Sequence, residues 1–226
     1  MKLLIGLLLI GSCTAGFIGL EDVEDVEEEG KDCNAQLKEG DTVVAESAYE
    51  GCTELTSLTI PSTIITIEQS AFKGCTSLTS ITLPFGLEKI GMYAFEKSGL
   101  TSIIIPNTVT AMGGAVFGNC TELMAVTLPN AIERIPYACF ALCSALTYVE
   151  IPNSVQHIGH GAFIGCKAID DINIPEGIKT IGDRCVMSKI ARSPPKALSR
   201  VLTPSRLLLS LSLSLALSRS LSLSLA

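Results

Sequence analysis

The stretch AFKGCTSLTSITLP, residues 71 to 84, decides the fold, because versions of it return along most of the chain. It lies within the longer unit TIEQSAFKGCTSLTSITLPFGLE, residues 66 to 88. The prolines of the later units, Pro129, Pro152 and Pro175, stand 23 residues apart. A fixed period of this length is typical of a solenoid, in which each unit forms one coil and stacks on its neighbours.

Six copies of the unit fill residues 43 to 179. The third copy is one residue short, and the loss falls between Phe95 and Leu100. A seventh copy begins at Thr180 and fails after about Met187. We therefore expect six complete coils followed by a frayed partial coil.

Each copy carries a pattern of the type L-x-x-L-x-L just before its proline. This pattern predicts one parallel strand per coil with alternate side chains pointing inward. Proline has no N–H to give to a strand ladder, so the regular strand should end there. The predicted inward positions are Leu55, Leu58, Ile60; Leu78, Ile81, Leu83; Leu100, Ile103, Ile105; Leu123, Val126, Leu128; Leu146, Val149, Ile151; and Ile169, Ile172, Ile174.

The other half of each copy places a small residue beside an aromatic one, as in Ala71 and Phe72, four to five residues after Ile67. This spacing predicts a short helical or 3₁₀ turn that presses the phenylalanine into the core. The expected fold class is an α/β repeat solenoid of the leucine-rich type, with one parallel strand and one short helical or 3₁₀ turn per repeat.

The phrase A-F-x-x-C-x-x-L-x-x-I-x-L-P stands unchanged in the second copy and returns, conservatively altered, as AFIGCKAIDDINIP, residues 162 to 175. In these residues the chain resembles the BspA-like leucine-rich repeat family, and the likeness covers about 145 of 226 residues in six copies. The resemblance implies a secreted or cell-surface protein of bacteria or protists with adhesion or recognition roles. It brings no catalytic residues, so we expect neither an enzyme nor a cofactor.

The N-terminal segments have compositions of their own. Residues 1 to 16 show the basic, apolar and small-residue order of a secretory signal peptide, and a lipoprotein cleavage box that would leave Cys13 lipidated is the alternative. Residues 17 to 42 hold the acidic run EDVEDVEEEGKD, 21 to 32, which predicts a solvated linker. A calcium loop is the alternative, but the spacing does not provide the glycine and the alternating oxygen ligands of an EF-hand. The solenoid should then occupy residues 43 to 188.

Residues 189 to 226 leave the repeat and end in LLLSLSLSLALSRSLSLSLA, 207 to 226. Three interpretations of this low-complexity tail stay open. The first is a translated intron or a gene-model error, because a CT dinucleotide repeat in DNA encodes alternating leucine and serine. The second interpretation is a membrane anchor, although the charge of Arg219 is costly inside an apolar stretch. The third is a native disordered tail. Membrane contact is expected only through such an anchor.

Charge and histidine content exclude several function classes. Residues 1 to 183 hold all 23 acids against nine basic residues, a formal charge of −14. Phosphate contacts need a basic face, so we expect no nucleic-acid partner. His157 and His160 are the only histidines, no third ligand is evident beside them, and no Cys-x₂-Cys pair is present. We therefore predict no metal site.

Cysteine recurs at one position of the repeat, at Cys52, Cys75, Cys120, Cys143 and Cys166. We interpret this recurrence as a ladder of buried thiols that fills space between coils, and disulfides between neighbouring coils are the alternative. Four cysteines lie outside the ladder, among them Cys33 in the linker and Cys139, four residues before Cys143. In a secretory compartment these two are expected to be the oxidised ones.

The residues that flank the inward pair should face outward on a concave strand face. They are small and mostly hydroxylated in the first four copies, and larger, aromatic or acidic in the last two. This asymmetry predicts a partner-binding site at Tyr148, Glu150, Asp171 and Asn173, where an aromatic ring stands beside carboxylates. The predicted function is a secreted or cell-surface module that binds a protein or a glycan. A structural or ice-ordering surface protein is the alternative.

Overall fold

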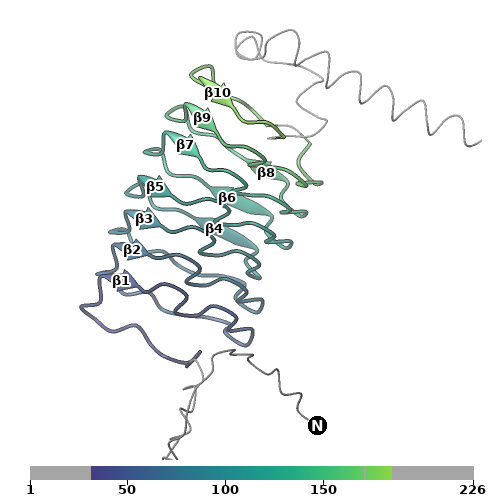
Figure 1. Cartoon of the computed structure of the whole chain (residues 1–226). Coiled ribbons are helices and arrows are strands. Elements are labelled where there is room, and N and C mark those ends of the chain that lie inside the picture. The colour runs from purple at the N-terminus through teal and green to yellow at the C-terminus, as the bar shows by residue number, and fades with distance from the viewer. Residues whose placement is uncertain (1–31, 171, 185–226) are drawn as a thin grey trace, which may run out of the picture. The chain divides into compact units, whose positions relative to one another are not determined.

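The computed structural model describes residues 32 to 170 and 172 to 184. In this part of the chain each sequence repeat forms one coil, and the coils stack in the order of the sequence (Figure 1). The paired strands are all parallel, and each pairs with the equivalent residues of a neighbouring coil. This is the stacked parallel arrangement that the period predicts.

Seven two-residue strands form what we call the turn ladder, because each runs directly into the turn that carries the aromatic residue. The ladder comprises two sheets, with the orders β1-β2-β3-β5 and β10-β9-β7. The strands are β1 (Val43–Val44), β2 (Thr66–Ile67), β3 (Lys89–Ile90), β5 (Ala111–Met112), β7 (Arg134–Ile135), β9 (His157–Ile158) and β10 (Thr180–Ile181). The sequence analysis did not predict this ladder.

The predicted strand at the leucine pattern is present in the third, fourth and fifth coils. A parallel sheet of order β4-β6-β8 joins β4 (Ser102–Ile104), β6 (Ala125–Thr127) and β8 (Tyr148–Val149). The described residues of the first, second and sixth coils form no strand at this position. We call the outward side of these segments in all six coils the leucine face.

The predicted helical or 3₁₀ turn is wrong, since the described residues contain no helix. The second coil shows why. Ser70 and Gly74 have φ angles of 55° and 75°, whereas right-handed helices need negative φ. The N–H groups of Ser70, Phe72 and Gly74 donate to carbonyls of the following coil at 2.7 to 2.9 Å. These donors therefore point along the stacking direction instead of closing a helical turn.

The prediction that phenylalanine fills the core is confirmed. One aromatic residue per coil is buried, and the rings of successive coils stack with centroids 5.2 to 5.7 Å apart. The stack consists of Tyr49, Phe72, Phe95, Phe117, Phe140 and Phe163. The leucine-pattern residues surround it and are buried in every coil, apart from the partly exposed Ile81.

The one-residue deletion in the third coil is absorbed by a serine and a glycine. Ser98 takes the place of the repeat cysteine, and its hydroxyl lies 3.3 Å from the thiol of Cys120. Gly99 follows, and its N–H donates to the carbonyl of Cys75 at 3.1 Å. A side chain at Gly99 would collide with the carbonyl oxygen of Thr76, so the shortened coil needs glycine here.

Residues 32 to 42, which the sequence analysis placed in the acidic linker, cover the start of the first coil. A disulfide joins Cys33 to Cys52 across 19 residues of sequence. Leu37 packs against the core, and the hydroxyl of Tyr49 donates to the carbonyl of Ala35 at 2.8 Å. This segment therefore caps the open end of the aromatic stack.

The buried thiol ladder is confirmed at Cys75, Cys120 and Cys143, and Cys166 continues it partly exposed, but the prediction is wrong for Cys52, which forms a disulfide. The thiols of Cys120, Cys143 and Cys166 each donate to the carbonyl of the aromatic residue one coil back, at 3.0 Å. The expectation for Cys33 is met, but that for Cys139 is wrong, because Cys139 is fully buried and forms no disulfide. Its side chain replaces the small residue beside Phe140 and is a packing group.

Candidate binding surface

The leucine face presents side chains in registered columns. In β4, β6 and β8 the middle residues Ile103, Val126 and Val149 point inward and are buried. Their neighbours point outward because alternate residues of a strand face opposite ways. Ser102, Ala125 and Tyr148 are direct partners in one column, and Ile104 is paired with Thr127 in the next. All five are exposed.

The structure places three of the four predicted binding residues on this face. Tyr148 is 60% exposed, and Glu150 and Asn173 are exposed at equivalent positions of the fifth and sixth coils. Asp171 lies outside the described residues. Tyr148, in β8, and Glu150, just after it, flank the buried Val149, and both are exposed on the outward side of this coil.

An apolar patch, which we define as Ile104, Met124, Ala125 and Tyr148, extends the site toward the third coil. Ile104 is 72% exposed and Met124 is 52% exposed. Met124 directly precedes Ala125, the strand partner of Tyr148. Neighbouring strands lie about 4.8 Å apart, so these four residues lie on three successive coils of the same face. Met124 was not predicted from the sequence, although it replaces the threonine of the equivalent positions Thr56, Thr79, Thr101 and Thr147.

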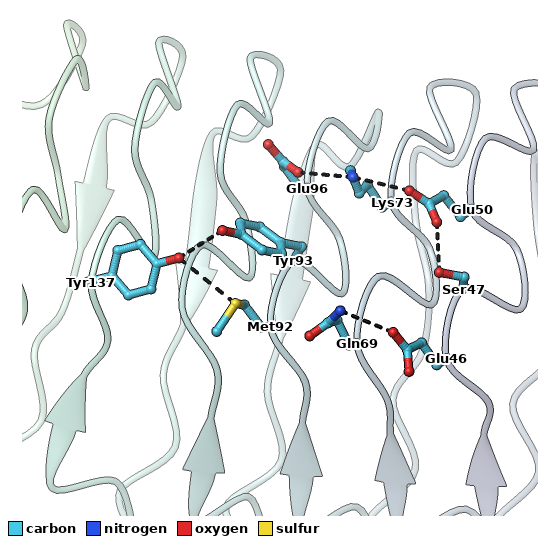
Figure 2. Close-up of polar contacts among 9 residues, drawn as sticks. All are labelled: Glu46, Ser47, Glu50, Gln69, Lys73, Met92, Tyr93, Glu96 and Tyr137. Atoms are coloured by element: carbon cyan, nitrogen blue, oxygen red, sulfur yellow. Dashed lines mark hydrogen bonds and ion pairs between the residues drawn. The ribbon is translucent and has the colours of Figure 1, made fainter. Parts of the chain in front are cut away.

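The turn side carries a second group of ordered polar contacts, shown in Figure 2. Lys73 lies between two carboxylates, 3.1 Å from Glu50 and 4.0 Å from Glu96. Its ammonium also lies 5.9 Å from the centre of the Tyr93 ring. These contacts join three successive coils, but the charged side chains stay partly exposed to solvent, and ion pairs of this kind contribute little to stability.

Beyond Lys73, the same group contains a pair of tyrosines. The hydroxyl oxygens of Tyr93 and Tyr137 lie 2.8 Å apart, and the Tyr137 oxygen lies 3.9 Å from the sulfur of Met92 (Figure 2). The Tyr93 hydrogen bond raises the pKa of Tyr137 above its ordinary value. The Tyr137 phenol is therefore protonated at neutral pH.

The two histidines lie at the other end of the turn side. The Nδ1 atom of His157 is 2.7 Å from the hydroxyl of Thr180, its strand partner, and His160 is exposed. Over residues 32 to 170 and 172 to 184, no three side chains of the metal-binding types gather into one site. The same residues include no helix of the length and apolarity needed to cross a bilayer.

Comparison with known proteins supports the repeat assignment. The model of the BspA type leucine-rich repeat region, which holds six copies, matches residues 42–147 and 133–192. A search of the curated proteins found no relative.

Two solved structures are similar in fold. A leucine-rich repeat protein from Bacteroides ovatus is 30% identical, with a TM-score of 0.65, over 68% of this chain and 40% of that one. A leucine-rich repeat protein from Eubacterium ventriosum is 28% identical, with a TM-score of 0.55, over 64% of this chain and 39% of that one. The chain therefore spans about two fifths of the length of these relatives.

Proposed function

The chain belongs to the BspA type leucine-rich repeat family, and from that premise we propose that it is a secreted or cell-surface binding module. The leucine face recognises a protein or a glycan, and the chain has no catalytic role. One observation carries the proposal, namely the exposure of Ile104, Met124 and Tyr148 on adjacent coils. Contiguous exposed apolar side chains rimmed by polar ones are typical of interaction sites.

The centre of the proposed contact is the apolar patch, and Tyr148 is its main anchor. Tyrosine is frequent among residues that dominate binding energy, because it offers a large rigid area and a polar tip. Glu150 and Asn173 stand at the polar rim toward the sixth coil. The aliphatic side chains of Ile104 and Met124 favour a protein partner over a glycan, since they offer hydrophobic area and no strong hydrogen-bonding group.

The disulfide supports the proposed location. Cys33 and Cys52 are joined, and disulfides persist mainly in oxidising compartments outside the cytosol. This agrees with the secretory signal expected from residues 1 to 16, which lie outside the described residues. The exposed Ile104, Met124 and Tyr148 also interrupt the regular hydroxyl columns that an ice-ordering surface would need.

The test screens the full chain against an array of glycans and a library of extracellular proteins. For a partner found in this way, Tyr148→Ala and Ile104→Ala should each weaken binding by more than about 1 kcal/mol, which is roughly fivefold or more in Kd. Ser57→Ala and Thr82→Ala lie on the same face outside the patch and serve as matched controls. An equal loss in both sets, or a loss only in the controls, would place the site elsewhere.

A further inference from the structure

Tyr93 and Tyr137 come from the third and fifth coils and meet above the fourth. Their hydroxyl oxygens are 2.8 Å apart, and Figure 2 shows the two rings pointing toward each other. Tyr137 is 43% exposed and Tyr93 is partly exposed, so small oxidants in solution reach both residues.

The intervening coil is shaped to let this pair meet. Gly114 lies under the Tyr137 ring, and a Cβ atom built on it would collide with three carbon atoms of that ring. The next residue of this coil, Ala115, is also small. The tyrosine therefore occupies the space that a side chain on the fourth coil would otherwise fill.

Tyr93 is held in a backbone conformation that its residue type rarely adopts. Its φ angle is 59°, in the left-handed region, which costs an ordinary residue roughly 1 to 2 kcal/mol. The other complete coils place only small residues at this position, namely Ser47, Ser70, Ala115, Ala138 and Gly161. The Lys73 ammonium over the ring and the hydrogen bond to Tyr137 fix the strained tyrosine in place. Strain of this kind is often associated with function.

We propose that Tyr93 and Tyr137 form an oxidative modification site, at which hydrogen peroxide and a haem peroxidase join the two rings as an intramolecular dityrosine. The product bridges the third and fifth coils on the outside of the solenoid, adding a covalent link to a stack otherwise held by packing and hydrogen bonds. The link does not depend on a ligand of the leucine face.

The proposed coupling is a two-electron oxidation of the pair of phenols. Each phenol loses one electron and one proton, giving two phenoxyl radicals whose unpaired spin is shared between the oxygen and the ortho carbons. A bond forms between one Cε carbon of each ring, and the hydrogen on each of these carbons moves to its oxygen, which restores both aromatic rings. One peroxide molecule takes up the two electrons and two protons and becomes two water molecules. In the product the hydroxyls flank the new bond and again lie within hydrogen-bonding distance of each other, as they do before reaction.

The remaining side chains make the site selective and easy to follow. The chain has four tyrosines and no tryptophan. Tyr49 is buried and its hydroxyl donates to the carbonyl of Ala35, whereas Tyr148 stands on the leucine face. Met92 is the expected site of a side reaction, because thioethers are oxidised to sulfoxides.

The experiment treats the purified full chain with peroxide and horseradish peroxidase. Dityrosine is measured by its fluorescence, the loss of two hydrogen atoms by the mass of the monomer, and the linked residues by peptide mapping. We expect a monomeric product with Tyr93 joined to Tyr137. Tyr93→Phe and Tyr137→Phe should each abolish this product, whereas Tyr148→Phe and Met92→Leu should leave it in place.

A further variant tests the geometry without removing a phenol. Gly114→Val should displace the Tyr137 ring and lower the yield of the intramolecular link, and its urea midpoint shows whether the coils remain folded. An unchanged yield in a folded Gly114→Val variant would overturn the assigned role of the fourth coil. A wild-type product that is absent, or that forms only between molecules through Tyr148, would overturn the proposal itself.

Discussion

On the turn side of the second coil, Ser70, Phe72 and Gly74 each donate a backbone N–H to the coil that follows. On the leucine face, the paired strands found within residues 32 to 170 and 172 to 184 belong to the third, fourth and fifth coils. The turn ladder, in contrast, has a strand in all six coils and in the partial seventh. The two sides of the same coils therefore differ in how regularly the backbone holds them together.

This difference is reflected in the side chains that each side accepts. The turns need small residues or left-handed conformations at fixed positions, so few substitutions are compatible with close stacking. The outward positions of the leucine face range from Ser and Thr to Ile, Ala, Tyr, Glu and Asn. A surface that varies from coil to coil without disturbing the stack is well suited to recognition.

The largest expected effect lies in the aromatic stack. Phe117 is fully buried, and its ring stacks on Phe95 and Phe140 with centroids 5.7 and 5.6 Å away. Phe117→Ala should destabilise the fold by about 3 to 5 kcal/mol, because it leaves a cavity between coils. Urea unfolding followed by circular dichroism measures the change, and Phe95→Ala should behave alike. An unchanged midpoint would show that these rings do not hold the coils together.

The disulfide at the first coil should have the next largest effect. Replacing Cys33 by serine should cost about 2 to 4 kcal/mol, since the bond to Cys52 restricts the unfolded chain and fastens the cap over Tyr49. Urea midpoints of the variant and of the reduced wild-type chain provide the measurement. If neither midpoint falls, residues 32 to 42 contribute nothing to capping the stack.

Much of this fold follows from the sequence, because the repeat period fixes which residues lie above one another. The inward leucines and the buried phenylalanines were predicted on that basis. The shape of the turn was not, because the spacing of Ile67, Ala71 and Phe72 suits a helical turn as well as the observed one. The shape of the turn depends on the left-handed φ of Ser70 and of its equivalents. This conformation is not expected from a serine or an alanine in the sequence.

The candidate site was predicted only in part. Tyr148 was identified because its size stands out in its column, and the structure leaves it exposed. Met124 was not predicted because it precedes the alternating inward and outward positions of the strand, so the period of two does not assign it a side. The contact between Tyr93 and Tyr137 could not be predicted from the sequence, because it crosses an entire coil and depends on the space left at Gly114.

The buried thiols should make the fold sensitive to alkali. Burial raises the pKa of Cys120 from 9.0 to about 11, so the folded state holds the neutral thiol while the unfolded state ionises earlier. This contribution to stability is complete below pH 9 and is lost as the pH rises toward 11, at about 1.4 kcal/mol per unit of pKa shift. Cys120→Ser keeps a donor at the site without an ionising thiol. Its urea midpoint should therefore fall less steeply between these pH values, and an identical decline would contradict the assignment.

The smallest effect is expected on the leucine face, and it is the one on which the comparison depends. Ile104 and Tyr148 are 72% and 60% exposed, so Ile104→Ala and Tyr148→Ala remove side chains that bury little area. Each should change the free energy of unfolding by no more than about 0.5 kcal/mol, as is usual for surface substitutions. Urea unfolding of the two variants and of Phe117→Ala under the same conditions lets their free energies of unfolding be compared directly. A loss of several kcal/mol would mean that these residues hold the coils together, and weakened binding in the same variants would then reflect a damaged fold instead of a lost contact.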